Sequence, residues 1–479
     1  MNATTSDHEA IARLDALIQS QRAAFLHELR PSATQRIAWL KQLEQMVLRN
    51  QDRIAEAIAA DFGTHAPALT RITELLGPVG RARYARKQVR RWMSPQSRPI
   101  DRVLFGLARN ELRPQPVGLV GNMSPWNFPF DISFGPLADT LAAGCRTVIK
   151  PSEHVPESAA LIEELVTEFF DPDVVAVVRG GVELAKAFAA RPGDHLLFTG
   201  GPEIAKEVMR AAAEHLTPVT LELGGKNPTV VAPDKIDLAT ARTIVATKMV
   251  KAGQMCITTD YVFVPRDRMD DFVDLAQQAM RGLYPRAIDN PDSTSIIDQR
   301  HFDRLESWVK EAEAAGATVV PLDPAGEEMD REGRKLPLYL VLDPSDELQL
   351  MRHEIFGPIL PVKPYDDLDE VLAYINARPR PLALYVFSGR SAIVDRIVDG
   401  TVSGGVAVNA VALHAMQPTL PFGGTGRSGM GHHHGYEGFL TFSKMKPVFR
   451  QFPINGSSLL YPPYGAAVKR LLDFLLPRH

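Results

Sequence analysis

The residues best suited to covalent chemistry are Cys256, in the run 253–258 (GQMCIT), and Glu222, in the run 221–225 (LELGG). A thiolate can attack an electrophilic carbon, and a carboxylate can take a proton from water. A carboxylate between two leucines is costly to bury without a partner, which favours a chemical function for Glu222. We predict that Cys256 is a nucleophile and Glu222 a general base. The alternatives are a buried structural cysteine and a surface glutamate at the end of a strand.

The neighbours of the two cysteines differ. Gly253 permits close approach of the backbone near Cys256, and Gln254 and Thr258 are polar side chains unsuited to an apolar core. Cys145, in the run AAGCR, directly precedes an expected strand, and we predict that it is structural. Two cysteines in 479 residues do not form a disulfide framework, so we expect a cytoplasmic protein with free thiols.

A loop at 125–129 (PWNFP) follows an expected strand and is stiffened by two prolines. The carboxyl ends of strands in open α/β sheets are where ligands bind. The side-chain amide of Asn127 is a donor suited to an oxyanion, so we predict that it belongs to the same site. The alternative is an aromatic turn that packs on the core.

Four further segments suggest a dinucleotide site. Lys150 and Glu153 follow a strand and could bracket a ribose, where Glu153 would repel a 2′-phosphate and favour NAD over NADP. Thr199 and Gly200 lead from a strand into a helix whose amides could hold a pyrophosphate, although no GxGxxG motif is present. Glu354, in the run 354–358 (EIFGP), pairs a carboxylate with the ring of Phe356. The fourth segment is a glycine-rich turn at 421–426. A separate run of three adjacent histidines at 432–434 could suggest a metal site or a tag, and we predict no metal site there.

Composition excludes some classes of protein. The 53 basic and 57 acidic residues give a formal net charge of -4, so we expect no nucleic-acid partner. The sequence contains no secretory signal pattern and no apolar run long enough to span a bilayer. A short amphipathic helix expected at 466–476 could lie on a membrane, but we favour a packed terminal helix or an oligomer contact.

Hydrophobic periodicity predicts helices at 7–29 and 32–60, a solvated basic helix face at 81–91, and then an alternation of strands and helices. Such alternation is typical of parallel α/β sheets, and it restarts near 227, so we expect two α/β domains that meet close to 224–225. The expected strands are 117–120, 146–149, 174–178, 195–198, 228–231 and 261–264, and the expected helices are 132–143, 157–169, 182–189, 203–215, 238–250 and 269–280. An exposed hairpin or loop is expected at 323–335.

Taken together, these runs resemble the NAD(P)-dependent aldehyde dehydrogenase superfamily, in the same order and over roughly 9 to 447. The matching runs are 126–129 (WNFP), 150–153 (KPSE), 198–200 (FTG), 221–226 (LELGGK), 253–256 (GQMC) and 354–358 (EIFGP). The runs HLTPVT at 215–220, RPLALY at 380–385, SGGV at 403–406, SGMG at 428–431 and YPP at 461–463 are similar to the class 3 branch. The run 434–444 (HGYEGFLTFSK) resembles bacterial coniferyl aldehyde dehydrogenases.

The resemblance implies an aldehyde dehydrogenase fold and a set of roles. It implies a Rossmann-type NAD-binding domain at 1–98, 113–222 and 409–434, a catalytic domain at 223–408, and bridging segments at 99–112 and 435–479 that serve a homodimer. The implied roles are those of Cys256 as nucleophile, Glu222 as base, Asn127 as oxyanion donor, Lys150 and Glu153 at the adenosine ribose, Gly200 near the diphosphate, Glu354 at the nicotinamide ribose and Phe356 beside the ring. The pair Gly201-Pro202 and Ala205 depart from the family pattern.

We therefore predict oxidation of an aldehyde, with an aromatic substrate such as coniferyl aldehyde favoured, using NAD or alternatively NADP. Other hypotheses are a medium-chain aliphatic aldehyde dehydrogenase, a coenzyme A-acylating dehydrogenase, a cysteine hydrolase that pairs Cys256 with His414, and a non-catalytic membrane-associated dimer.

Overall fold

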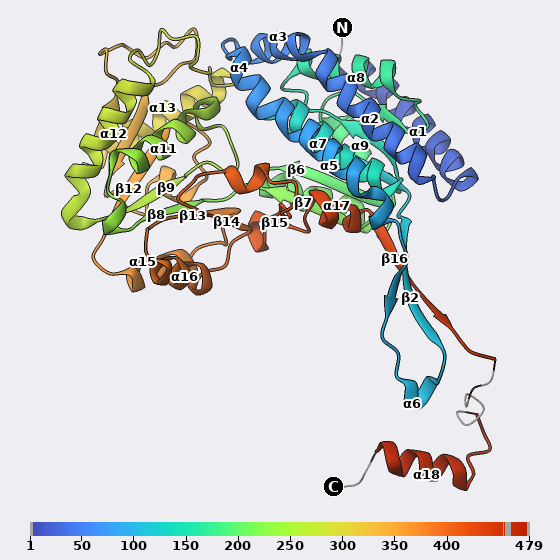
Figure 1. The fold of residues 1–479 in the computed structure, drawn as a ribbon. Coiled ribbons are helices and arrows are strands. Elements are labelled where there is room, and N and C mark those ends of the chain that lie inside the picture. Colours follow the sequence, from blue (N-terminus) through green and yellow to red (C-terminus); the bar gives the residue numbers. More distant parts are fainter. Residues whose placement is uncertain (1–2, 454, 456–460, 477–479) are drawn as a thin grey trace.

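The computed structural model describes residues 3–453, 455 and 461–476. Residues 1–2 of the expected NAD-binding domain, and residues 454, 456–460 and 477–479 of the expected bridging segment, lie outside the described residues. Two sheets lie in separate lobes, and a long arm built on a third, three-stranded sheet projects from one of them (Figure 1). The predicted α/β class with parallel sheets is confirmed.

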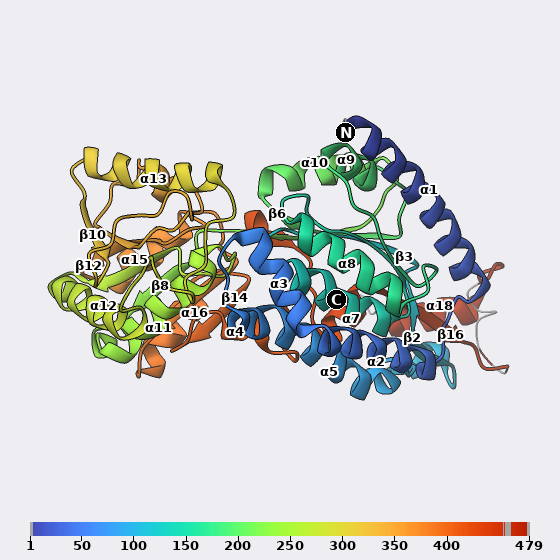
Figure 2. The ribbon, with the colours of Figure 1, turned by 90° about the horizontal axis from the view of Figure 1, so that it is seen from above.

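The first lobe is built on a six-stranded sheet of order β15-β7-β6-β3-β4-β5, parallel except for its edge strand β15. Its strands are β3 (Leu119–Met123), β4 (Arg146–Lys150), β5 (Val175–Val177), β6 (His195–Gly200), β7 (Val219–Leu223) and β15 (Gly429–Met430). Its helices are α1 (Ala3–His27), α2 (Ala33–Arg49), α3 (Gln51–Phe62), α4 (Pro67–Thr70), η1 (Arg71–Leu75), α5 (Leu76–Trp92), α7 (Pro129–Ala143), α8 (Pro156–Phe169), α9 (Val182–Ala189), α10 (Pro202–Ala213) and α17 (Gly435–Thr441). Figure 2 shows several of these helices from above.

The second lobe is built on a seven-stranded sheet of order β10-β11-β12-β9-β8-β13-β14, in which only β10 pairs antiparallel. Its strands are β8 (Pro228–Val231), β9 (Tyr261–Pro265), β10 (Thr318–Leu322), β11 (Leu338–Leu342), β12 (Ile359–Tyr365), β13 (Ala383–Phe387) and β14 (Gly405–Val408). Its helices are η2 (Pro233–Lys235), α11 (Leu238–Met249), η3 (Val250–Gly253), η4 (Arg266–Arg268), α12 (Met269–Leu283), α13 (Gln299–Ala314), α14 (Gln349–Arg352), α15 (Leu368–Asn376), α16 (Ser391–Gly400) and η5 (Leu413–Met416). The short helix η6 (Gly426–Ser428) contacts β7 of the first sheet. Strand β7 of the first sheet ends at Leu223 and β8 of the second begins at Pro228, so the chain passes between the sheets at 224–227.

The arm consists of β1 (Gln96–Arg98), β2 (Arg109–Pro116) and β16 (Ser443–Arg450), with α6 (Arg102–Phe105) between β1 and β2. The last helix, α18 (Ala466–Leu475), lies beyond the arm and away from both lobes (Figure 1). None of its residues is buried, so the expectation of a terminal helix packed on its own chain is wrong. In the part of the chain that the structure describes, no helix is long and apolar enough to cross a membrane.

Two other expectations about helices are corrected. The single helix expected at 32–60 is two helices, because Asn50 leaves helical geometry with φ -116° and caps α2, which begins with a capping box at Ser32. Arg81, expected on a solvated face, is 7% exposed and forms an ion pair of 2.5 Å with Asp131. The hydrophobic periodicity of the sequence does not reveal this ion pair, because Asp131 lies 50 positions away on α7.

Candidate active site

Cys256 follows a short turn, η3, whose backbone is unusual. Lys251 and Ala252 have φ values of 48° and 52°, and Gly253 has φ 75°. A Cβ at Gly253 would lie 2.4 Å from the carbonyl oxygen of Gly357, so only glycine fits there. This close approach of two loops fixes the direction in which the chain enters Cys256.

Side-chain amides hold the loop on both sides of Cys256. The Nδ2 of Asn227 donates to the carbonyl oxygens of Cys256 at 2.7 Å and of Thr258 at 3.0 Å. The Nε2 of Gln254 donates to the backbone carbonyl oxygens of Lys251 and Ser295, and its Oε1 accepts from the backbone amide of Ile297. Because these buried amides are satisfied, the loop has a defined geometry. Gln254, which the sequence shows only as a polar neighbour of Cys256, therefore stabilises the conformation of this loop.

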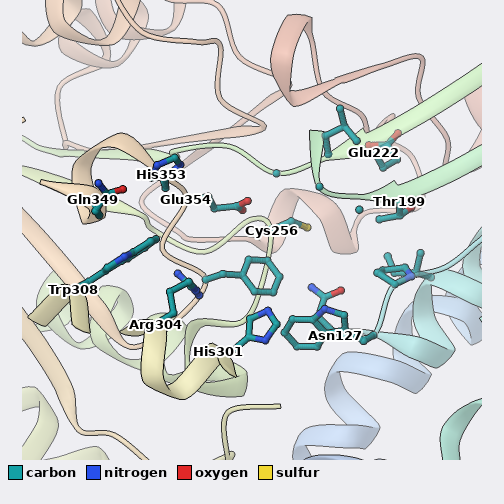
Figure 3. Close-up of a pocket in the computed structure, with 18 residues that line it drawn as sticks. Asn127, Thr199, Glu222, Cys256, His301, Arg304, Trp308, Gln349, His353 and Glu354 are labelled. Carbon is teal, nitrogen blue, oxygen red and sulfur yellow. The ribbon is translucent and has the colours of Figure 1, made fainter. Parts of the chain in front are cut away.

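Cys256 lines a cavity of about 560 Å³ between the two lobes. Most of the predicted site residues line the same cavity: Asn127, Thr199, Gly200, Glu222, Glu354 and Phe356. In Figure 3 the sulfur of Cys256 lies between Glu354 and Glu222 on one side and the amide of Asn127 on the other. The fold thus gathers residues from β6, β7 and loops of both lobes around one thiol.

Glu222 lies on β7 close to its carboxyl end and is 3% exposed. Neither of its carboxylate oxygens has a hydrogen-bond partner among the described residues. Burial raises the pKa of Glu222 well above its usual value. The alternative of a surface glutamate is therefore wrong, and the arrangement suits a group that accepts a proton from a molecule entering the cavity.

Glu354 packs directly against the turn that follows β7. Burial raises its pKa to about 8, with a further contribution from the charge of Asp260, while the amide of Gly225 donates to it. A Cβ at Gly224 would lie 1.9 Å from the Oε2 of Glu354. Gly224 therefore makes room for this carboxylate, and its Oε1 has no partner among the described residues.

The thiol of Cys256 is surrounded by acidic groups. Burial raises the pKa of Cys256, and the charges of Glu354 and Glu222 raise it further. The thiol is therefore protonated at neutral pH in this arrangement, and its reaction requires that the proton be taken away. Cys145 differs, because it is fully buried and donates to the carbonyl oxygen of Phe442 at 3.3 Å, as expected for a structural cysteine.

Asn127 is tied to the cysteine loop from the other lobe. The side-chain Nδ2 of Asn127 donates to the backbone carbonyl oxygen of Gln254 at 3.2 Å, and the backbone carbonyl oxygen of Asn127 accepts from the Nζ of Lys251 at 2.6 Å. Lys251 also forms a fully buried ion pair with Glu74, whose Oε2 accepts from two amides at the start of α7. This chain of contacts sets the distance between the side chains at positions 127 and 256.

Lys150 and Glu153 do not line the cavity of Cys256. They form an ion pair of 3.0 Å at the carboxyl end of β4, and Glu153 lines a separate cavity of about 510 Å³ together with Arg13 and Arg179. Burial raises the pKa of Glu153, but Lys150 outweighs this effect and the net pKa is lowered. Glu153 is thus a carboxylate that can accept from hydroxyl groups.

Sequence reasoning missed one wall of the cavity. His301, Arg304 and Trp308 lie on α13 at spacings of three and four residues, so they share one helix face, and all three line the cavity. The Nη2 of Arg304 donates to the carbonyl oxygen of Ile355 at 2.9 Å, and its guanidinium lies 4.4 Å from the ring centroid of Trp308. The spacing of these three residues along the sequence is the signal that could have revealed this wall of the cavity.

A second cavity, of about 240 Å³, also reaches Cys256 and shares only Ile132 and Cys256 with the first. Its lining is largely apolar and includes Phe128 and Phe422. His414 lines neither cavity, so the structure gives no support to a hydrolase in which it activates Cys256. A thiol that faces two cavities can meet one molecule from each.

Comparison with known proteins defines the class. The sequence profile of the Aldehyde dehydrogenase family matches residues 3–448. A probable coniferyl aldehyde dehydrogenase of Pseudomonas aeruginosa is 45% identical over 98% of both chains, and a coniferyl aldehyde dehydrogenase of a Pseudomonas species is 42% identical over 97% of this chain and 96% of its own. Aldehyde dehydrogenase family 3 member H1 of Arabidopsis thaliana is 36% identical over 92% and 90%. The solved substrate-bound AldH of Staphylococcus aureus superposes with a TM-score of 0.90 at 32% identity, over 96% of this chain and 99% of that one.

The chain therefore belongs to the aldehyde dehydrogenase family. It is an oxidoreductase that acts on aldehydes with a nicotinamide cofactor, and the resemblance to the class 3 branch predicted from the sequence is confirmed.

Proposed function

We propose that this protein oxidises an aromatic aldehyde of the coniferyl aldehyde type to its carboxylic acid, using Cys256 as nucleophile and NAD as cofactor. The observation that carries the proposal is the unpartnered, buried carboxylate of Glu222 in the same cavity as the Cys256 thiol. The names of the two Pseudomonas relatives support the substrate class.

The residues fit a dinucleotide in the first cavity. The Oγ1 of Thr199 and the Oε1 of Glu354 are buried without a partner among the described residues. The Thr199 hydroxyl can donate to a phosphate oxygen, and the Glu354 carboxylate can accept from a ribose hydroxyl. The amides at the start of α10, which begins at Pro202, could hold a pyrophosphate. Lys150 and Glu153 would bind the adenosine ribose, and the carboxylate of Glu153 disfavours the 2′-phosphate of NADP. When bound, the nicotinamide accepts the hydride that leaves the substrate carbon.

The chain's own residues carry the remaining steps. Cys256 gives its proton to the carboxylate of Glu222, which passes it on to solvent, and the thiolate sulfur adds to the carbonyl carbon to give a thiohemiacetal. The Asn127 amide and the Cys256 backbone amide donate to its oxyanion, and removal of such a donor typically costs roughly 100- to 1,000-fold in rate. Loss of hydride leaves a thioester on Cys256. Glu222 then takes a proton from water, which attacks the thioester and releases the acid and the thiol.

The position of Glu222 also favours hydrolysis over transfer of the acyl group to coenzyme A, because a water-activating base would consume the thioester. Incubation of the enzyme with aldehyde, NAD and coenzyme A should therefore yield free acid. Formation of acyl-coenzyme A as the main product would overturn this part of the proposal.

We further infer a domain division and a setting. The NAD-binding domain would comprise 1–98, 113–222 and 409–434, and the catalytic domain 223–408. The bridging segments at 99–112 and 435–479, which contribute to the projecting arm, would join two copies in a homodimer (Figure 1). Both cysteines are unpaired, which supports a reducing compartment such as the cytoplasm. Sedimentation of the purified protein tests the dimer.

A further inference from the structure

The second cavity at Cys256 has a distinct wall. Most of its lining is apolar, with the rings of Phe128 and Phe422 and the side chain of Val411 among its members. The histidines at 433 and 434, together with Arg81, lie in the same lining. We name these three residues the polar wall. The lining also includes Asp131, Thr73 and Thr247. A largely apolar chamber with a few polar groups in its lining is typical of a small-molecule site.

The polar wall has uncommitted hydrogen-bonding atoms. His433 is 1% exposed and His434 is 3% exposed, and the Nδ1 of each ring has no partner among the described residues. The Nη1 of Arg81 is likewise buried and unpartnered in the described chain, while its Nη2 bonds Asp131. Leaving a buried polar atom unpaired costs about 1–3 kcal/mol, so three such atoms together call for a ligand.

The backbone holds the two imidazoles in place. His433 exchanges backbone hydrogen bonds with Phe422, at 2.8 and 2.9 Å, and the amide of His434 donates to the Oδ2 of Asp139 at 3.0 Å. The ring centroids of the two histidines lie 4.4 Å apart and nearly perpendicular. The rings are therefore positioned next to each other without being bonded to each other.

The surroundings of both imidazoles favour the neutral form. Burial lowers the pKa of each ring well below its usual value, and the charge of Arg81 lowers it further. A neutral imidazole has one donor and one acceptor nitrogen. The pair can thus accept a hydrogen bond from a hydroxyl group and also donate one to the same oxygen, and Arg81 can add a donor.

We propose that the polar wall binds the phenolic hydroxyl of an aromatic aldehyde whose carbonyl carbon faces Cys256 and whose ring packs against Phe128 and Phe422. This inference rests on the proposed function and adds its substrate preference. The phenol donates its O–H to one imidazole and accepts from the other or from Arg81. An aldehyde without the hydroxyl would leave these buried groups unpaired, and sites of this kind discriminate strongly against such analogues.

The test compares kcat/KM for 4-hydroxycinnamaldehyde, 4-methoxycinnamaldehyde and cinnamaldehyde. A chamber with no polar recognition would favour the unsubstituted aldehyde, because burying a hydroxyl without a partner is unfavourable. We expect the opposite order, with the hydroxylated aldehyde preferred over cinnamaldehyde by roughly 10- to 100-fold, as loss of a buried hydrogen bond implies. The methoxy compound, which can only accept, should lie between them.

Single substitutions test which residues cause the preference for the hydroxylated aldehyde. In His433→Phe and His434→Phe the preference for the hydroxylated aldehyde should fall at least about fivefold in one or both variants, and in the corresponding Gln variants part of it should remain. His414→Phe is the matched control, because His414 is a nearby partly buried histidine with an unpartnered Nδ1 that does not line the chamber. Circular dichroism and NAD binding report whether each variant is folded.

Equal kcat/KM values for the hydroxylated and unsubstituted aldehydes in the unmodified enzyme would overturn the inference while leaving the proposed function standing. A preference that survives in both Phe variants would also overturn it. Failure of the unmodified enzyme to oxidise any of the three aldehydes would instead reject the proposed function. The substrate comparison on the unmodified enzyme decides the question even if a variant does not fold.

Discussion

Gly224 and Glu354 are so close that a single methyl group at position 224 would overlap the Glu354 carboxylate, with 1.9 Å between the new Cβ and Oε2. The turn after β7 and the loop before β12 are therefore fitted to each other at the cavity. Glu222, the proposed general base, lies two residues before Gly224. The contact therefore couples the position of Glu222 to that of Glu354, the residue proposed to bind the nicotinamide ribose.

The first prediction follows from that contact. Gly224→Ala should displace the Glu354 carboxylate and raise the Kd for NAD by roughly tenfold or more, which corresponds to about 1.4 kcal/mol. Gly282→Ala, on an open face of α12 with nothing within 4 Å of the added atom, is the control and should bind NAD normally. Titration of protein fluorescence with NAD measures both. Unchanged affinity in Gly224→Ala would show that Glu354 does not bind the cofactor.

The second prediction concerns the buried pair Lys251–Glu74, which joins the loops of Asn127 and Cys256. Glu74→Gln would leave an uncompensated charge in a site where both side chains are fully buried, and it should lower the free energy of unfolding by about 3–5 kcal/mol. Glu183→Gln removes the exposed pair with Lys186 and should cost at most about 1 kcal/mol. Urea denaturation compares the two. Similar small losses in both variants would mean that the pair does not stabilise the fold.

The third prediction uses the raised pKa of Glu222. In the folded protein the pKa of Glu222 lies above the ordinary value of 4.5. The contribution of this group to stability is therefore fully present below pH 4.5 and is lost as the pH rises through the pKa of the folded state. Glu222→Gln removes a buried, unpaired carboxylate and should therefore be more stable than the parent at pH 7, by about 1–3 kcal/mol, with the gain shrinking as the pH falls toward 4.5 and absent below it. Thermal unfolding across pH tests this. A variant that is less stable at pH 7 would indicate a partner for Glu222.

The fourth prediction concerns thiol reactivity. Because burial and two acidic neighbours raise the pKa of Cys256, iodoacetamide should alkylate it more slowly at pH 7.5 than an ordinary thiol, in protein free of cofactor. Glu354→Gln and Glu222→Gln should each increase the rate. Cys145, whose pKa burial raises to about 11, serves as an internal reference and should stay unmodified in the folded protein. Peptide mass spectrometry follows both sites, and fast labelling of Cys256 that neither variant changes would contradict this description.

Sequence patterns predicted the parallel strands of the first lobe because apolar runs bounded by glycine and proline are local signals. They also predicted that 127, 222 and 256 belong together, through resemblance to a family. They did not predict the left-handed backbone at Lys251 and Ala252, since neither residue type favours it. The pair Lys251–Glu74 spans 177 positions, and no local pattern announces a contact at that separation.

The chamber next to Cys256 was also missed. The run of three adjacent histidines suggested only a metal site or a tag. The burial of His433 and His434 beside an exposed His432 depends on the bend at His434, where φ is 82°. The placement of Glu153 away from the thiol cavity likewise follows from strand order, which puts β4 beyond β3. The roles of the site residues therefore stay predictions until the chemistry is measured.

The most direct test of the account mixes Glu222→Gln enzyme with NAD and an aromatic aldehyde, quenches the reaction in acid within milliseconds to seconds, and maps the modified peptide by mass spectrometry. We predict a burst of reduced nicotinamide close to one per active site, an acyl group on the peptide that contains Cys256, and slow release of acid. Steady turnover at the rate of the unmodified enzyme with no adduct on Cys256, or full activity in Cys256→Ala, would contradict it.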